Sequence, residues 1–407
     1  MSNENTQFNT NTTQDNGLSA EMKTYYEARL IDNAEPYLVH DQFGDSYPIP
    51  ANRGKTIEFR RFSPLDKALS TLTEGVTPTG NTLEVTSKSG TVAQYGDYIT
   101  VSDVLETTAI DRTLEQATKL LGSQAGRTLD TVTREVITAG TNVLYAPKSD
   151  GTEVLTRDGL DSTCLLTPNL FFRAAAKLYE MNAMPVDECF VAIIHPNAAC
   201  DLMTDADWID AHKYAAPENL YRGEIGKLAN IRFVQSTEAK IVAPAPIQGS
   251  FNRLTVKTAV TESGTSVVVN EVLKSETPDT PIEVYVNGVK NTVTAIANNT
   301  TYSTLTLGTA IASLAAGSVI CGTGAMKNGH SVYLTMVIGA NAYGVTELAG
   351  GGLQHIVKQL GSGGSADPLN QRATTGWKAT KAAVRLVEEN MVRLEHAVKT
   401  NPTAKAN

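Results

Sequence analysis

The chain has 407 residues, of which 41% are hydrophobic, 19% charged and 6% aromatic, and its formal net charge is −9. This length exceeds one compact core and predicts two or three domains. The negative charge argues against a protein that grips nucleic acid through clustered Lys and Arg. The four cysteines form no CxxC pair and are too sparse for a disulfide framework, which predicts reduced thiols and assembly in a cytoplasm.

Residues 1–46 are predicted to form an N-terminal arm. Residues 1–17 are rich in Asn, Thr and Gln and carry no basic or apolar leader segment, so we expect neither order nor a signal peptide there. A short helix is expected at 21–30, followed by a stretch punctuated by Pro48 and Pro50. No apolar run in the sequence approaches the ~20 residues of a membrane span, so no membrane partner is expected.

Residues 47–100 are predicted to form a long β-hairpin. Residues 56–62, 82–86 and 91–100 read as strands, and the turn residues of TEGVTPTGN separate the first two. So few large apolar residues cannot form a core, and an isolated hairpin is only marginally stable in water. The hairpin is therefore expected to lie on the body of the chain or on a neighbouring subunit.

A long helix is predicted over residues 108–140. Residues 108–111 resemble a capping box, and Leu and Ala recur at helical spacing until Gly140 stops the run. The opposite face carries charged residues that include Asp130 and Arg134. This pattern predicts a spine with one face buried on a sheet and the other in water.

The second half of the chain reads as an α/β region interrupted by a β domain. Helices are expected at 169–184 and 197–203, a strand buried on both faces at 189–194, and a further strand at 231–234. After Ala243-Pro244-Ala245-Pro246 the sequence becomes rich in Val and Thr with an Asn-Gly turn at 287–288, which predicts a β-sandwich or small barrel. Helix-and-strand sequence resumes near residue 332, and 391–395 is expected to be a strand returning to the spine.

The sequence offers little catalytic or ligand-binding chemistry. Gly361-Ser362-Gly363-Gly364 and Gly322-Thr323-Gly324 lack the remainder of a phosphate-binding motif. His195 with Cys200 and Asp201 lacks zinc spacing, and the Asp residues at 201–210 lack the glycine and glutamate of a calcium loop. No G-x-S-x-G motif is present. We therefore expect no enzyme activity, no cofactor and no metal; Lys67 and Lys88 are weak candidates for covalent cross-linking.

Several blocks in the same order resemble the major capsid proteins of tailed phages related to coliphage N-four, whose members are expected to have the Hong Kong 97-type capsid fold. The resemblance covers nearly the whole chain except the polar start and the Val/Thr-rich segment. The matching residues are GKTIEFRRF at 54–62, LTEGVTP at 72–78, QYGDY at 94–98, VSDV at 101–104, AHKY at 211–214, GEIG at 223–226, IRFV at 231–234, DPLNQRAT at 367–374 and GWKA at 376–379.

The resemblance implies an α+β chain divided into named parts. These are the arm at 1–46, an extended loop at 47–100, a peripheral domain with the spine helix at 101–160 and 373–399, an axial domain at 161–244 and 327–372, an inserted all-β domain at 245–326, and a tail at 400–407. The extended loop would lie across a neighbouring subunit. Its expected contact residues are Arg60, Arg61, Glu74, Gly75, Pro78 and Gly80, with the glycines allowing a tight turn at the tip.

The function that the resemblance implies is that of a major capsid protein of a tailed double-stranded DNA phage. Hexamers and pentamers of the chain would assemble in the host cytoplasm into the icosahedral head of the virion, enclosing DNA without sequence-specific binding. Portal, scaffolding or decoration proteins would be further partners. The alternatives are an encapsulin-like shell around cargo enzymes, an adhesive surface protein, which would need a signal peptide, and an α/β enzyme, which would need a catalytic motif.

Overall fold

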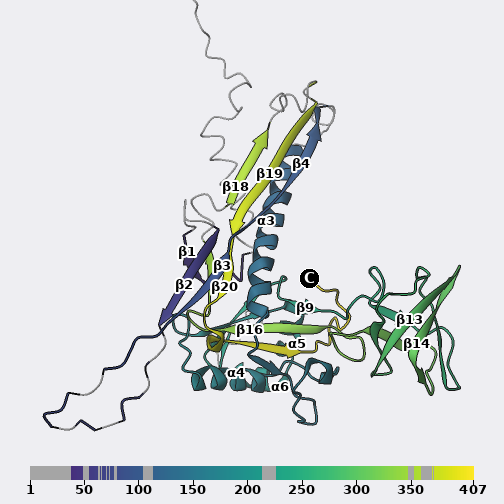
Figure 1. Cartoon of the computed structure of the whole chain (residues 1–407), viewed down its shortest axis with the longest axis horizontal. Helices are drawn as coiled ribbons and strands as arrows, with labels where there is room; N and C mark the ends of the chain where they lie inside the picture. The colour runs from purple at the N-terminus through teal and green to yellow at the C-terminus, as the bar shows by residue number, and fades with distance from the viewer. Residues whose placement is uncertain are drawn as a thin grey trace, which may run out of the picture. The chain divides into compact units, whose positions relative to one another are not determined.

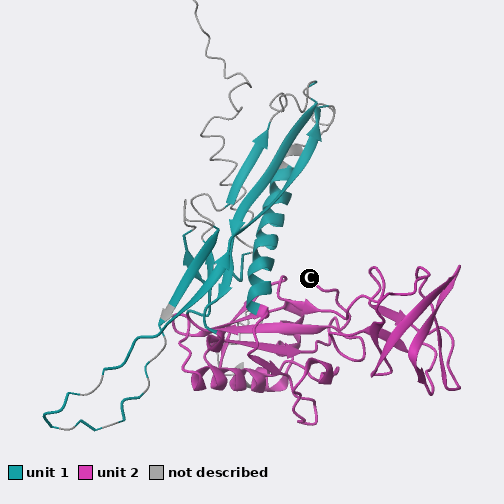
Figure 2. Cartoon of the chain, in the orientation of Figure 1, with its two compact units in different colours: residues 1–137, 341–387 teal, residues 138–340, 388–407 magenta. Residues whose placement is uncertain are grey.

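A computed structural model describes residues 38–48, 55–62, 65, 67–69, 71–72, 74–77, 80–103, 113–212, 226–346, 353–358, 369 and 371–407. The chain is α+β and divides into two compact units, coloured separately in Figure 2. Unit 1 contains residues 1–137 and 341–387, and unit 2 contains residues 138–340 and 388–407. The predicted helix at 21–30 and the predicted capping box at 108–111 lie outside the described residues.

In unit 1 the long helix α3 (Thr113–Thr138) lies on one face of a three-stranded sheet (Figure 1). The strand order is β18 (Leu353–Lys358), β19 (Arg372–Lys381) and β4 (Ala93–Ser102), all antiparallel. Leu121, Ala125 and Leu129 recur every four residues and therefore share one helix face. They pack with Leu353, Trp377 and Ala379 of the sheet, as the spacing of the helix predicts.

Unit 1 also holds the hairpin of β2 (Thr56–Phe62) and β3 (Val85–Thr91), which pair antiparallel over their whole length. A second sheet anchors its base and consists of β1 (Asp45–Tyr47), β17 (Tyr343–Thr346) and β20 (Ala383–Arg385). Phe59 is buried, and its ring meets that of Tyr47 edge-on at 4.8 Å. The hairpin therefore lacks a core of its own, as predicted, and rests by its base on the body of the same unit.

Gly90 permits this close approach of the hairpin to β20. A Cβ added at Gly90 would lie 2.2 Å from Cγ2 of Val384. We expect Gly90→Ala to lower the free energy of unfolding by about 1–3 kcal/mol, because overpacking forces the two strands apart. Urea denaturation of the purified chain measures this loss. The double variant Gly90→Ala/Val384→Ala should regain most of it, and a double variant as unstable as the single one would contradict the explanation.

Unit 2 is built on a mixed seven-stranded sheet with buried central strands. The order is β5 (Val143–Tyr145), β21 (Met391–His396), β16 (Val332–Ile338), β6 (Phe190–Ile194), β8 (Ile231–Gln235) and β7 (Lys227–Leu228), with β9 (Ile241–Val242) also paired to β16. The helices α4 (Pro168–Glu180), α5 (Pro196–Met203) and α6 (Ala206–His212) belong to the same unit. Leu170, Phe171 and Leu178 of α4 join the apolar core over the sheet.

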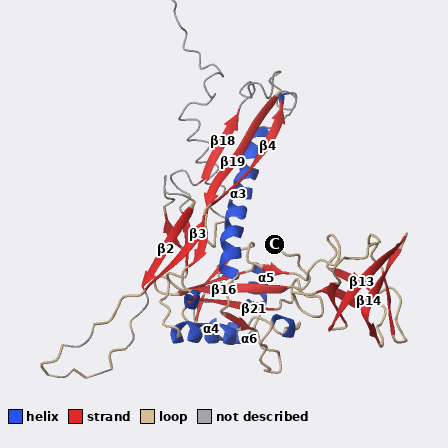
Figure 3. Cartoon of the chain, viewed as in Figure 1, coloured by secondary structure: helices blue, strands red, loops and turns tan. Residues whose placement is uncertain are grey.

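The Val/Thr-rich segment forms a separate sheet within unit 2, at the right of Figure 3. Its strand order is β10 (Arg253–Thr255), β15 (Val319–Gly322), β12 (Ile282–Val286), β13 (Val289–Asn299), β14 (Tyr302–Ile311) and β11 (Gly264–Val269). A bridge between Val256 and Val269 joins the first strand to the last and closes a small barrel. The barrel has its own apolar core, and Asn287 and Gly288 both have the positive φ of the predicted turn.

The strand predicted at 391–395 is present as β21, which pairs with β16 and β5 in unit 2, and Arg393 donates to the backbone carbonyl of Thr138 at the end of α3. Two other strand assignments differ from the structure. Residues 353–358, assigned to the axial part, pair with β19 in unit 1. The predicted strand 82–86 begins only at Val85 and extends to Thr91, since its Ser- and Thr-rich half also pairs with β2.

Candidate inter-subunit surface

The chain between β2 and β3 presents an exposed apolar surface. Within the described residues of this segment no helix or strand is present (Figure 1). Large apolar side chains along it and at its two ends are 51–84% exposed, namely Phe62, Leu65, Leu69, Leu72, Val76, Leu83 and Val85. Exposed apolar side chains gathered in one segment indicate a contact surface, whereas single ones scattered over a protein do not.

The predicted contact residues divide between this loop and the hairpin. Arg60 projects from β2 with a largely exposed side chain and lies 3.6 Å from Glu58, an exposed ion pair that stabilises little. Glu74 and Gly75 form an exposed turn in which Gly75 has a φ of +78°. Gly80 is exposed without a positive φ, so only Gly75 needs the left-handed backbone. Arg61 continues β2, while its side chain and Pro78 lie outside the described residues.

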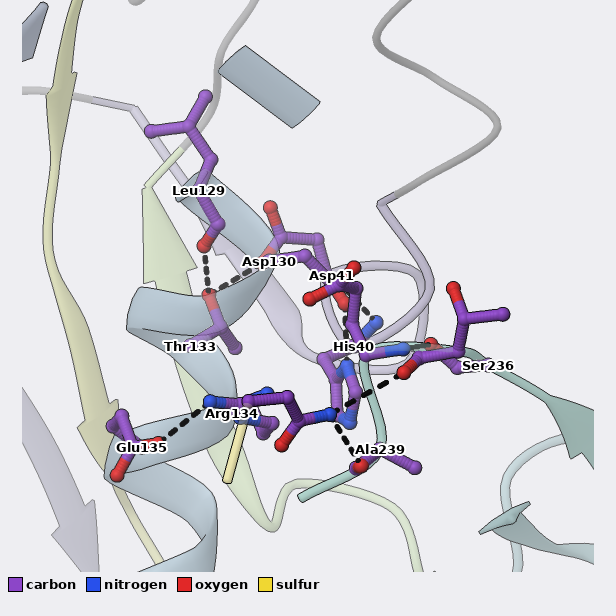
Figure 4. Close-up of polar contacts among 12 residues, drawn as sticks. His40, Asp41, Leu129, Asp130, Thr133, Arg134, Glu135, Ser236 and Ala239 are labelled. Carbon is purple, nitrogen blue, oxygen red and sulfur yellow. Dashed lines mark hydrogen bonds and ion pairs between the residues drawn. The ribbon is translucent and has the colours of Figure 1, made fainter. Parts of the chain in front are cut away.

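Buried polar contacts pin the segment before β1 to α3 (Figure 4). His40 Nδ1 lies 2.6 Å from Asp130 Oδ2, and the His40 backbone N–H donates to Asp130 Oδ1 at 2.7 Å. Thr133 donates to Asp41 Oδ1 at 2.5 Å, and Lys381 of β19 pairs with the same Asp41 carboxylate. Because buried charges are tolerated only when paired, these contacts fix residues 40 and 41 against α3 and β19.

Tyr343 of β17 completes this cluster. Its hydroxyl donates to the backbone carbonyl of His40. Burial, together with the charges of Asp41 and Asp130, raises the pKa of Tyr343 well above its usual range, so the hydroxyl remains a neutral donor. This cluster was not predicted from the sequence. The expectation that Asp130 and Arg134 lie on the water-facing side of the helix is wrong, because both are buried.

A second group of exposed apolar side chains lies in unit 2. Phe172 and Tyr179 of α4 are about half exposed, and Met184, which follows the helix, is more exposed. Leu155 is also exposed, and an ion pair of 2.8 Å between Glu153 and Arg173 holds its segment near α4. These four side chains are 50–82% exposed and form a smaller candidate contact surface.

The described residues contain no group of three or more His, Cys, Asp or Glu side chains that could hold a metal ion. His195, Cys200 and Asp201, considered from the sequence, are thus not gathered into such a site. None of the helices in the described part of the chain is long and apolar enough to cross a membrane.

The fold is that of phage capsid proteins. The chain matches the capsid structure of the cyanophage P-SCSP1u with a TM-score of 0.51 and 16% identity, over 88% of this chain and 87% of that one. The capsid asymmetric unit of cyanophage Pam1 matches with a TM-score of 0.51 and 11% identity, over 92% of this chain and 93% of that one. The acid-stable capsid of Helicobacter pylori bacteriophage KHP30 matches with a TM-score of 0.50 and 10% identity, over 86% of this chain and 87% of that one. No protein-family model and no curated protein matches the sequence.

Proposed function

We propose that this chain is the major capsid protein of a tailed double-stranded DNA phage and has the Hong Kong 97-type architecture. The observation that carries the proposal is the likeness of fold, which extends over about nine-tenths of this chain and of the capsid proteins compared. The sequence resemblance to the N-four-related capsid proteins supports the same assignment. The role is structural, and no catalytic step is assigned to any residue.

In this proposal the parts of the chain take the names of the capsid fold. The arm is 1–46, and the extended loop is the part of 47–100 that precedes β4. The peripheral domain is α3 with the sheet of β18, β19 and β4, and the axial domain is the seven-stranded sheet of unit 2. The barrel is the inserted domain. These assignments follow the strand pairing and so replace the sequence-based boundaries at 353–358 and 391–396.

The extended loop is proposed to lie on a neighbouring copy of the chain. Burying one large apolar side chain contributes roughly 1.5–3 kcal/mol, part of which offsets the ordering of the loop. A modest contact of this kind becomes strong when closed symmetry repeats it through hexamers and pentamers. Arg60, Glu74 and Gly75 would flank the apolar contact, and the exposed face of α4 would form a second one.

The experiment that tests the proposal is expression of the chain followed by negative-stain electron microscopy and size-exclusion chromatography. We expect closed polyhedral particles, or tubes and sheets of hexamers. A monomer or dimer that persists at high concentration with scaffold supplied would overturn the proposal. Particles that enclose protein cargo and no genome when formed in the native host would instead identify an encapsulin-like shell.

The loop itself is tested by Leu69→Ser/Leu72→Ser, which removes two of its most exposed apolar side chains. We expect the assembled fraction to fall at least tenfold while the melting temperature of the unassembled chain stays the same. Val289→Ser is the matched control, because Val289 is similarly exposed but lies on the barrel. Deletion of residues 71–81 should act like the double variant, and normal stable particles from that deletion would refute the role of the loop.

A further inference from the structure

Two linkers, residues 243–252 and 323–331, join the barrel to the seven-stranded sheet. They lie side by side where they enter the barrel, and we call this part the neck. The backbone N–H of Ala245 donates to Thr323 O at 2.8 Å, and that of Gly322 donates to Asn252 O at 3.1 Å. The approach is so close that a Cβ on Gly322 would lie 2.0 Å from the carbonyl oxygen of Ala245. Beyond this point, Ala325 and Met326 are fully buried in the core of the sheet. The neck is therefore packed protein and not a free tether.

A first polar tie crosses from the barrel through the second linker to the C-terminal segment. Arg253 of β10 donates from Nη2 to Ser331 Oγ at 2.9 Å and also donates to Gly329 O. Ser331 is fully buried, and its hydroxyl donates in turn to Ala404 O at 2.6 Å. The backbone N–H of Ser331 donates to Pro402 O at 2.8 Å. Residues 402–404 thus hold the end of the linker from the side of the sheet.

A second tie lies in the short 3-10 helix η2 (Arg157–Gly159). The hydroxyl of Tyr285, in β12 of the barrel, donates to Asp158 Oδ2 at 2.6 Å, and the Tyr285 side chain is almost completely buried. The preceding Arg157 makes two hydrogen bonds of 2.6 Å to Glu395 of β21. Asp158 is therefore held by a neighbour that is itself anchored in the central sheet.

We propose that these two ties hold the barrel in one fixed orientation on the seven-stranded sheet, so that the barrel and the sheet form one rigid body. The ties leave the barrel from different strands, β10 and β12, and reach different parts of the sheet, so together they restrain rotation about the paired linkers. A surface presented in one fixed orientation binds a partner with less loss of conformational entropy than a tethered one. This inference does not depend on the proposed function.

The test measures the distance between the barrel and the sheet within one subunit. Cys200 is exposed whereas Cys164, Cys189 and Cys321 are buried, so a spin label on Cys200 and a second on Asn299→Cys, at the end of β13, report the orientation of the barrel. Diluting labelled chain with unlabelled chain removes distances between subunits. Double electron–electron resonance should give one narrow distance distribution, which broadens at least twofold in Tyr285→Phe/Ser331→Ala.

Tyr302→Phe is the matched control, since it removes a hydroxyl from the same barrel without touching either tie, and its distribution should remain narrow. A narrow distribution in Tyr285→Phe/Ser331→Ala would overturn the proposal, as would a broad one in the otherwise unaltered chain. Thermal unfolding identifies a double variant that has lost its fold. In that case Tyr285→Phe alone, which removes one hydroxyl, is expected to broaden the distance distribution by a smaller factor. An unchanged distribution in Tyr285→Phe would again refute the proposal of a fixed orientation.

Discussion

Replacing Glu395 by alanine is expected to lower the free energy of unfolding by about 3–5 kcal/mol, because it removes the partner of two cations in the interior of unit 2. The Glu395 side chain is inaccessible to solvent and lies between Arg157, at 2.6 Å, and Arg393, at 2.9 Å. Without it two guanidinium groups keep their desolvation cost and lose their compensating charge. Because an arginine guanidinium is not deprotonated in proteins, neither cation can remove this cost by losing its proton.

Guanidinium denaturation of Glu395→Ala measures the loss, and Glu283→Ala is the matched control. Glu283 pairs with Lys290 at 2.7 Å, but both side chains are about half exposed, so this pair contributes roughly 0–1 kcal/mol. Glu395→Gln keeps the shape and one acceptor, and its loss should lie between those of the two alanine variants. Equal losses for Glu395→Ala and Glu283→Ala would show that the buried charges do not stabilise this unit.

The sequence predicted the parts of the fold that local periodicity determines. The four-residue recurrence of Leu121, Ala125 and Leu129 gave the helix and its buried face. The Asn287-Gly288 pair gave the turn of a hairpin that the structure contains. The continuous apolar run at 190–194 gave a strand buried along its whole length. In each case the pattern is complete within one segment, so no distant residue was needed to interpret it.

The strand β21 shows why other parts could not be predicted. The alternation in Met391-Val392-Arg393-Leu394-Glu395 is typical of a strand with one face in water. In the structure both faces are covered, and Arg393 and Glu395 neutralise each other with the help of Arg157, which is 238 residues from Glu395. A single sequence does not reveal such a pairing, and the same holds for His40 with Asp130 and for Asp41 with Lys381.

The candidate surface was predictable to a similar degree. The low apolar content of the hairpin correctly indicated that it needs an external support, and its base lies on Tyr47 and β20. The charged and turn residues chosen from the sequence are at its surface where the structure describes them. The exposed Leu and Val side chains of the loop were missed, because an apolar residue in a loop gives no sequence signal until its exposure is known.

Acidification is expected to destabilise unit 2 between pH 6.5 and about 4 through His396. Burial lowers the pKa of His396 from 6.5 to about 4. Nδ1 lies 3.0 Å from the Ala397 carbonyl, which can only accept and therefore raises this pKa, and Nε2 lies 3.0 Å from the Thr335 hydroxyl. Burial outweighs the hydrogen bond to Ala397, so the pKa remains low. The nearby charges oppose one another, because Asp201 and Glu395 raise this pKa while His195 lowers it.

Acidification lowers the stability because the unfolded chain binds a proton at His396 at a higher pH than the folded chain does. Above pH 6.5 His396 is neutral in both the folded and the unfolded chain and contributes no pH dependence. Below pH 6.5 the unfolded chain takes up a proton that the folded chain refuses until about pH 4, so stability falls over this range by up to about 3 kcal/mol. Burial also lowers the pKa values of His195 and His330, which adds smaller losses in the same direction.

Urea denaturation at pH 7.0, 6.0, 5.0 and 4.2 measures this dependence. The variant His396→Gln should be less stable at pH 7 but lose less stability on acidification, whereas His330→Gln, at a partly exposed position, should follow the slope of the unaltered chain closely. Protonation of carboxylates is common to all three chains and cancels in the comparison. If His396→Gln and the unaltered chain lost stability equally between pH 7.0 and 4.2, then the buried imidazole would not be the group that makes unit 2 sensitive to acid.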